Sequence, residues 1–259
     1  MLSDFLSNLP IYVLSLPVAL LALSFHETAH GYVALKLGDQ TARNFGRLSL
    51  NPLRHIDILG FLCMVFFHFG WAKPVPINTR NFKNPRRDMA LTGLAGPVSN
   101  LILATLSVLL LRLCTFISGR FFAADLQLLP QYFSGLSDVA PSIGFTMFSI
   151  FSVIVYLGVI INIGYAIFNL IPVPPLDGSR IFYVFLPTRW YFAVMKYERI
   201  IMLALFVLLW LGFLDVPLNF AMGSVKGLLF NMVGMGVKTD AYKTFSSMYR
   251  YVIFNLVVL

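Results

Sequence analysis

The chain has 259 residues, of which 58% are hydrophobic and 12% are charged. Soluble globular domains are about 45–50% apolar and about 25% charged, so this composition excludes an ordinary soluble domain and indicates a polytopic membrane protein. The net charge of +8 does not indicate nucleic-acid binding, because the basic residues lie beside apolar runs, as in membrane proteins.

The apolar segments, in chain order, predict the transmembrane helices, each of which needs about 20 mostly apolar residues. The first segment, about 9–37, is long enough and carries the letters HETAH near its C-terminal end. The next segment, 55–71, is too short and too interrupted for a span, and we expect it to be re-entrant. Further spans are expected at about 89–117, 143–170 and 198–214. The tail, 216–259, contains shorter apolar stretches, and we expect it to be interfacial.

The fold class predicted by these segments is an all-α polytopic membrane protein. We expect about five transmembrane helices plus a re-entrant or β-hairpin segment. The length suits a single transmembrane domain over 1–259, with its core at about 9–215 and the interfacial tail beyond it.

The basic residues predict how the chain crosses the membrane. Nine Lys and Arg side chains lie from Lys36 to Arg87, at or beyond the end of the first span, and only two, Arg112 and Arg120, lie near the following connection. The positive-inside rule therefore places 38–88 and 178–198 in the cytoplasm and 118–142 outside, with the N-terminus external. If 55–71 crossed the membrane, basic stretches would fall on opposite faces, so we expect this segment to dip in and return.

The HETAH letters indicate a metal site. His26 and His30 lie four residues apart, so they share one face of a helix, and Glu27 lies beside them. This pattern is the two-ligand half of a zinc metalloprotease site, with the glutamate as general base. The alternative is two histidines that bond to neighbouring backbone. It is less favoured because idle polar groups are costly in a membrane.

Asp177 is the best candidate for a third ligand. A catalytic zinc usually has three protein ligands plus water. Asp177 follows an apolar helix in the stretch NLIPVPPLDG, whose prolines cannot continue as regular helix. Broken backbone at membrane depth is tolerated where it lines a cavity or is buried in protein. The alternative for Asp177 is an ordinary helix-end turn at the interface.

Three motifs, HETAH, GPVSN (96–100) and NLIPVPPLDG (169–178), resemble the site-2 protease family of intramembrane zinc metalloproteases. The family patterns HExxH, GPxxN and NxxPxxxLDG all match in order, and the resemblance covers about residues 15–200. It implies a minimal member without a PDZ or nucleotide-binding module. It also implies one Zn2+ per chain, with Glu27 as the catalytic carboxylate. The implied zinc ligands are His26, His30 and Asp177, and Asn100 is implied as a cavity residue near the substrate or oxyanion.

The resemblance implies a metalloendopeptidase that hydrolyses a peptide bond within or near a transmembrane segment of a membrane-protein substrate. With the predicted topology, we expect a multi-pass protein of the cell membrane whose site faces the cytoplasmic side. A polytopic transporter is one alternative, which the lack of a visible internal repeat disfavours. A catalytically inactive scaffold of the same fold is another, which the intact Glu27 disfavours. The sequence leaves open a regulatory membrane protein as a further partner, and the oligomeric state.

Two further segments leave alternatives open. In NPLRHIDILGF, which resembles a family segment except that Ile58 replaces a proline, His55 and Asp57 either line the cavity or form an interfacial turn. His68 is expected at the headgroup level. The stretch AKPVPIN (72–78) is either a plain surface loop or a hairpin whose edge pairs with a substrate strand, because proline confines a strand to an edge.

Overall fold

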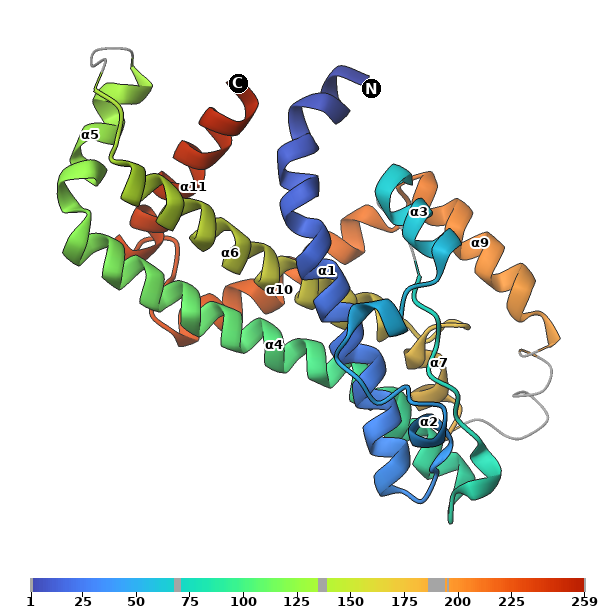
Figure 1. The fold of residues 1–259 in the computed structure, drawn as a ribbon. Coiled ribbons are helices and arrows are strands. Elements are labelled where there is room, and N and C mark those ends of the chain that lie inside the picture. Colours follow the sequence, from blue (N-terminus) through green and yellow to red (C-terminus); the bar gives the residue numbers. More distant parts are fainter. Residues whose placement is uncertain (1, 68–70, 135–138, 186–193, 195, 259) are drawn as a thin grey trace. The chain divides into compact units, whose positions relative to one another are not determined.

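Figure 1 shows the computed structural model, which describes residues 2–67, 71–134, 139–185, 194 and 196–258. The described chain is mostly helical, and its β pairing is limited to one isolated antiparallel bridge, between Ile56 and Ala72. The chain divides into two compact units. The site unit comprises Ala19–Ile102 and Ile161–Gly223, and the aromatic unit comprises Met1–Val18, Leu103–Ile160 and Ser224–Leu259.

The unit boundaries cut across long helices, so α1, α4, α6 and α10 each belong to both units. In the described residues the helices are, in chain order, α1 (Leu2–Lys36), α2 (Thr41–Asn44), η1 (Pro52–Arg54), α3 (Ile58–Phe67), η2 (Thr79–Asn81), α4 (Pro85–Phe121), α5 (Ala123–Phe133), α6 (Ile143–Asn169), α7 (Asp177–Phe182), α9 (Glu198–Trp210), α10 (Asp215–Met232) and α11 (Asp240–Val258).

Among the residues that the structure describes, three helical segments are long and apolar enough to cross a membrane: Leu9–Lys36 of α1, the whole of α4 and the whole of α6. They coincide with the first, second and third full spans predicted from the sequence. The span predicted at 198–214 differs, because α9 has only 13 residues. α9 and α10 qualify as one span only together, across a bend of 81°. The described chain thus holds three or four candidate spans, where about five were predicted.

A glycine ends α9 earlier than its apolar composition suggests. Gly212 has a φ of 75°, a left-handed conformation that favours glycine. The N–H of Phe213 donates to the carbonyl of Leu208, and the N–H of Gly212 donates to the carbonyl of Leu209. This pair of bonds is a Schellman motif, which satisfies the last carbonyls of a helix and stops it. The following helix, α10, then begins at Asp215.

The aromatic unit has its own apolar core. Helix α11 packs against α5, and the hydroxyl of Tyr132 donates to Oδ1 of Asn255 at 2.8 Å. The tail predicted as interfacial forms two helices, α10 with 18 residues and α11 with 19. Its position relative to a membrane stays a prediction. The buried core consists of Leu129, Phe145, Val153, Met248, Tyr251 and Val252.

The segment predicted as re-entrant contains the ten-residue helix α3, which is too short to span a membrane. Its two ends lie side by side, because Ile56 and Ala72 form the antiparallel bridge and the N–H of Lys73 donates to the carbonyl of His55 at 2.8 Å. This geometry suits a chain that enters and returns on one side. Membrane entry itself stays a prediction, and His68 lies outside the described residues.

Candidate metal centre

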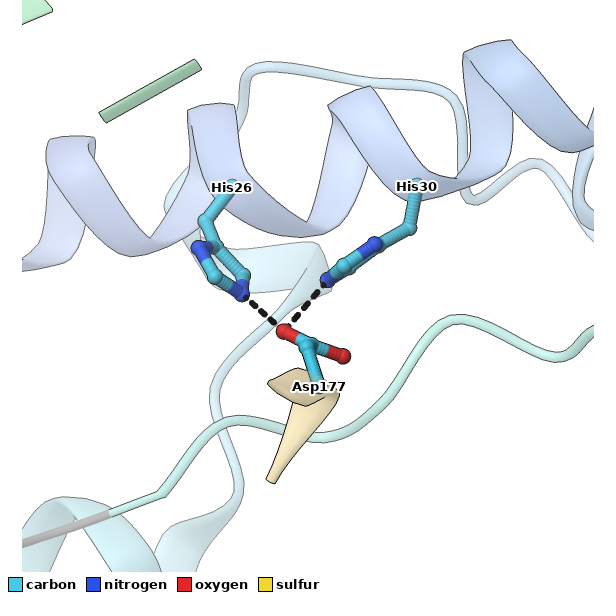
Figure 2. A group of neighbouring side chains, drawn as sticks. All are labelled: His26, His30 and Asp177. Atoms are coloured by element: carbon cyan, nitrogen blue, oxygen red, sulfur yellow. Dashed lines mark hydrogen bonds and ion pairs between the residues drawn. The ribbon is translucent and has the colours of Figure 1, made fainter. Parts of the chain in front are cut away.

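Two histidines of α1 converge on the first residue of α7. His26 and His30 lie one turn apart, and Figure 2 shows both rings pointing at Asp177. Oδ2 of Asp177 lies 3.0 Å from Nε2 of His26 and 3.1 Å from Nε2 of His30. All three side chains are buried, and all belong to the site unit. Together they form a group that could hold a metal ion.

The opposite nitrogen of each ring contacts an oxygen acceptor. Nδ1 of His26 lies 2.6 Å from Oδ1 of Asn100, and Nδ1 of His30 lies 2.7 Å from the carbonyl oxygen of Thr92. A neutral imidazole has one N–H, so a ring that donates from Nδ1 keeps a lone pair on Nε2. Two such lone pairs and a carboxylate oxygen then face one another, an arrangement that suits a cation between them.

The spacing of these atoms suits zinc. Ligand atoms on one tetrahedral zinc lie about 3.3 Å apart, because each ligand lies about 2.0–2.2 Å from the ion. The separations of 3.0 and 3.1 Å between Asp177 and the two rings are close to this value. Two imidazoles and one carboxylate are also a common ligand set of catalytic zinc sites. The residues present therefore fit the metal that the motifs imply.

A glycine of α4 leaves room for the two rings. A Cβ atom added to Gly96 would lie 2.5 Å from Nε2 of His30 and 2.6 Å from Nε2 of His26. Contacts this short are not tolerated, so an alanine at this position would displace the ligand atoms. Gly96 is the first letter of GPVSN, and its role is therefore steric: it lets the backbone of α4 approach the site.

The turn that brings Asp177 to the site also needs a glycine, directly after Asp177. Helix α6 ends at Asn169, and the proline-rich stretch folds back so that a Cβ added to Gly178 would lie 2.3 Å from the carbonyl oxygen of Leu170. This close approach explains the glycine that follows Asp177. One turn further along α7, Nη1 of Arg180 lies 3.8 Å from Oδ1 of Asp177, the oxygen that faces away from the histidines.

Asn100 lies behind His26 and is fully buried. Its Oδ1 contacts His26, and its Nδ2 donates to Oδ1 of Asn162 at 2.8 Å and to the carbonyl oxygen of Ala22 at 3.2 Å. Both ends of the amide are therefore engaged within the protein. The expected role of Asn100 near a substrate or oxyanion stays a prediction.

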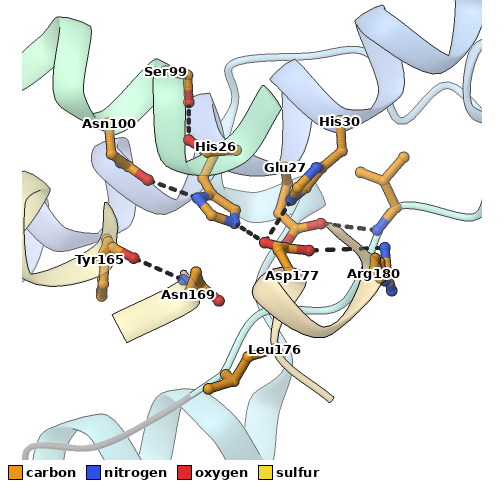
Figure 3. A network of polar contacts seen from close by, with 12 residues as sticks. His26, Glu27, His30, Ser99, Asn100, Tyr165, Asn169, Leu176, Asp177 and Arg180 are labelled. Carbon is orange, nitrogen blue, oxygen red and sulfur yellow. Dashed lines mark hydrogen bonds and ion pairs between the residues drawn. The ribbon is translucent and has the colours of Figure 1, made fainter. Parts of the chain in front are cut away.

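Glu27 contacts the stretch AKPVPIN. Its Oε2 accepts the N–H of Val75 at 2.9 Å, and the side chain of Glu27 is partly exposed while Val75 is buried. Figure 3 shows Glu27 beside His30 and Asp177. The stretch 72–78 contains no strand, although Ala72 takes part in the isolated bridge. The structure therefore places it as an extended segment beside the catalytic carboxylate predicted from the sequence.

Asp39 fixes the far end of that segment. After α1, Gly38 adopts a φ of 109°, and the buried Asp39 accepts the N–H of Thr41 at 3.0 Å, the N–H of Asn78 at 2.7 Å and Nδ2 of Asn81 at 2.7 Å. Burial opposes ionisation, but these hydrogen bonds and that of the Thr41 hydroxyl hold the pKa of Asp39 below its ordinary value. No sequence motif points to Asp39, because Gly-Asp after a helix is an ordinary turn signal.

His55 and Asp57 are not part of the metal group. Nε2 of the buried His55 donates to the carbonyl oxygen of Ser49 at 2.6 Å, and that oxygen also accepts the hydroxyl of Thr28 from the HETAH motif. Oδ1 of Asp57 accepts the N–H of Gly60 at 2.9 Å at the start of α3. Both contacts favour the turn interpretation: His55 supports the loop beside α1, and Asp57 caps a helix.

Comparison with known proteins agrees with this geometry. Residues 15–212 match the model of peptidase family M50. The "Putative zinc metalloprotease YwhC" of Bacillus subtilis (strain 168) is 40% identical over 176 residues, which cover 68% of this chain and 69% of that protein. The "Putative zinc metalloprotease Rip2" of Mycolicibacterium smegmatis is 30% identical over 132 residues, which cover 47% of this chain and 51% of that protein. No solved structure shows significant similarity. The chain therefore belongs to peptidase family M50, the site-2 protease family.

Proposed function

We propose that the protein is an intramembrane zinc endopeptidase in which His26, His30 and Asp177 hold the metal and Glu27 is the general base. The observation that carries this proposal is the convergence of two imidazole Nε2 atoms and a carboxylate oxygen in a buried site, with each Nδ1 engaged by an oxygen. Bound zinc supplies Lewis acidity, which polarises the scissile carbonyl and raises the acidity of water.

The protein groups then have separate roles. Glu27 follows His26 on α1, and the N–H of Val75 fixes one of its oxygens. The carboxylate accepts a proton from the attacking water and returns it to the leaving amine, as a general base that becomes a general acid. In this proposal Asn100 orients His26 through the contact of its Oδ1 with Nδ1 of the ring.

The substrate class follows from the location of the site. His26 and His30 lie within the candidate span Leu9–Lys36, so the peptide must reach them at or within the membrane. A helix in lipid satisfies its own carbonyls, so a transmembrane substrate must unwind locally before attack. We infer a membrane-protein substrate, a site toward the cytoplasmic side of the cell membrane and an external N-terminus. Membership of a peptidase family argues against the transporter alternative.

Three variants test the site. Glu27→Gln should lower cleavage about 10²–10⁴-fold and leave zinc bound, because Glu27 is a base and not a ligand. Asp177→Asn should lose zinc and activity together, and the control Asp57→Asn should lose neither. Metal analysis of the purified variants, with casein and a labelled transmembrane peptide as substrates, measures both properties. Full zinc in Asp177→Asn, with zinc lost in Asp57→Asn, would move the third ligand and refute the proposed site.

Reporter fusions test the topology. A fusion at Asn81 should report the cytoplasmic side and a fusion at Gln131 the external side, because the first connection is rich in basic residues and the second is poor in them. A fusion at Arg43 serves as the control on the other side of the short segment. If Arg43 and Asn81 reported opposite sides, 55–71 would be a true span and the re-entrant model would be wrong.

A further inference from the structure

The position of the ring hydrogen of His26 depends on the amide of Asn100, which has an oxygen at one end and a nitrogen at the other. Nδ1 of His26 contacts Oδ1 of Asn100 at 2.6 Å, and both residues are buried. An amide oxygen accepts a hydrogen bond, whereas the amide nitrogen only donates. If the amide turned over, two N–H groups would face each other. His26 would then have to carry its hydrogen on Nε2, and that nitrogen would lose the lone pair that a metal needs.

His30 does not share this dependence. Its Nδ1 contacts the backbone carbonyl of Thr92, which has a single polar end and is held in α4. The two ligands are thus oriented by different means: one by a backbone oxygen that cannot turn over, the other by an amide whose orientation something else must fix.

The group that fixes this amide comes from α6. Asn162 is buried, and its Oδ1 accepts Nδ2 of Asn100 at 2.8 Å, while the carbonyl oxygen of Ala22 accepts the same nitrogen at 3.2 Å. Turning the amide over would set its oxygen against both acceptors and leave buried groups unsatisfied, which costs about 1–3 kcal/mol for each group. Asn162 belongs to none of the three sequence motifs.

We propose that Asn162 is a positioning residue that sets the orientation of the Asn100 amide, and thereby the ring hydrogen of His26, for metal binding. This inference rests on the proposed function only in taking His26 as a ligand. It extends the site beyond the residues next to the metal, since Asn162 reaches the zinc through two side chains.

The test compares variants that keep or remove the acceptor. Asn162→Leu removes it at similar volume and should lower zinc affinity about tenfold, a size typical of losing a group that orients a metal ligand. It should also change the visible absorption spectrum of the Co2+-substituted protein, which reports ligand geometry. Asn162→Asp keeps an acceptor and should retain near wild-type affinity. Asn162→Ala removes the same acceptor and serves if the leucine variant does not fold.

A double variant separates orientation from packing. A carboxylate has two acceptor oxygens, so it accepts from His26 in either orientation and needs no residue to fix it. Asn162→Leu should therefore cost much less zinc affinity in an Asn100→Asp background. An equal loss in both backgrounds, or wild-type affinity and spectrum in Asn162→Leu and Asn162→Ala, would overturn the role of Asn162. His26→Ala is the separate control for the proposed function: if it kept zinc, the site itself would be wrong.

Discussion

The two units bury different kinds of polar group. Every buried imidazole, carboxylate and amide of the described residues lies in the site unit, whereas the buried residues with polar groups in the aromatic unit carry hydroxyls or a thiol: Thr115, Ser118, Ser149, Ser152, Tyr251 and Cys114. Two of these hydroxyls, on Thr115 and Ser152, return a hydrogen bond to their own helix. The difference shows that groups that are expensive to bury are confined to the part of the chain that can use them.

The contacts of these groups also differ in sequence range. In the site unit, buried polar side chains join segments far apart in the chain, such as His26 with Asp177 and Asp39 with Asn81. In the aromatic unit, distant segments are joined by apolar and aromatic packing, for example between Phe145 and Tyr251, together with partly buried hydrogen bonds such as that of Tyr132 to Asn255. We therefore expect the substitutions that affect the metal to lie in the site unit, and substitutions in the aromatic unit to affect stability alone.

The largest expected effect compares two glycines of α4. Gly96→Ala should lower zinc affinity about 10–100-fold or more and abolish activity, because the new methyl group would collide with both ring nitrogens. Gly119→Ala, in the aromatic unit, is the matched control, since a Cβ there meets nothing within 4 Å. Zinc content and activity of the two variants are the measurements. Equal zinc content in Gly96→Ala and Gly119→Ala would contradict the expected difference between the two units.

A smaller effect is expected at Asp39. Asp39→Ala should lower the free energy of unfolding by about 1–3 kcal/mol, because it removes a buried acceptor that bonds the N–H groups of Thr41 and Asn78 and Nδ2 of Asn81. Asp125→Ala is the control in the aromatic unit, where the carboxylate binds Ser142 near the surface and should matter less. Thermal unfolding in detergent measures both, and a larger loss in Asp125→Ala would contradict the comparison.

The pH dependence sharpens this prediction. The pKa of Asp39 is lowered in the folded protein, so its stabilisation is present above the ordinary carboxyl pKa of about 4 and is lost as pH falls through the folded value. The stability difference between wild type and Asp39→Asn should therefore shrink on acidification from pH 7 toward pH 3. A difference that stayed constant over this range would exclude the charge of Asp39 as its source.

The smallest effect is expected in the aromatic unit. Tyr132→Phe removes the hydrogen bond to Asn255 and should lower the free energy of unfolding by about 1 kcal/mol, with zinc content and activity unchanged. Thermal unfolding and metal analysis of the same preparation are sufficient. Loss of zinc in this variant would show that the two units are coupled.

The parts of the site that sequence could predict are those with local patterns. His26 and His30 follow from helical spacing alone, and the three long spans follow from apolar length. Asp177 could be chosen because broken backbone follows an apolar helix. The end of α9 was also visible in principle, since Gly212 followed shortly by Asp215 is a stop and start signal that the apolar run obscured.

The parts that sequence could not predict depend on non-local contacts. In the sequence, Asp39 has the pattern of an ordinary turn residue. Its hydrogen bonds with Asn78 and Asn81 are visible only in the structure. Asn162 was visible as a polar residue inside a predicted span, which is a signal of function in membranes, but its partner Asn100 was not. The contacts of Asn100 with His26 and Asn162 could not be predicted, because a motif gives the identity of a residue and not the direction of its side chain.

The occupied N–H groups and the prolines of segment 72–78 limit which peptide strands can pair with it. Pro74 and Pro76 carry no N–H, and the N–H groups of Lys73, Val75 and Asn78 already donate to His55, Glu27 and Asp39. A foreign strand laid along the segment would meet carbonyl acceptors but few free donors. Exposed strand edges invite aggregation, and proline is one of the devices that blunt them. The stretch beside Glu27 is thus protected against indiscriminate β pairing, and a peptide that binds there must supply its own N–H groups.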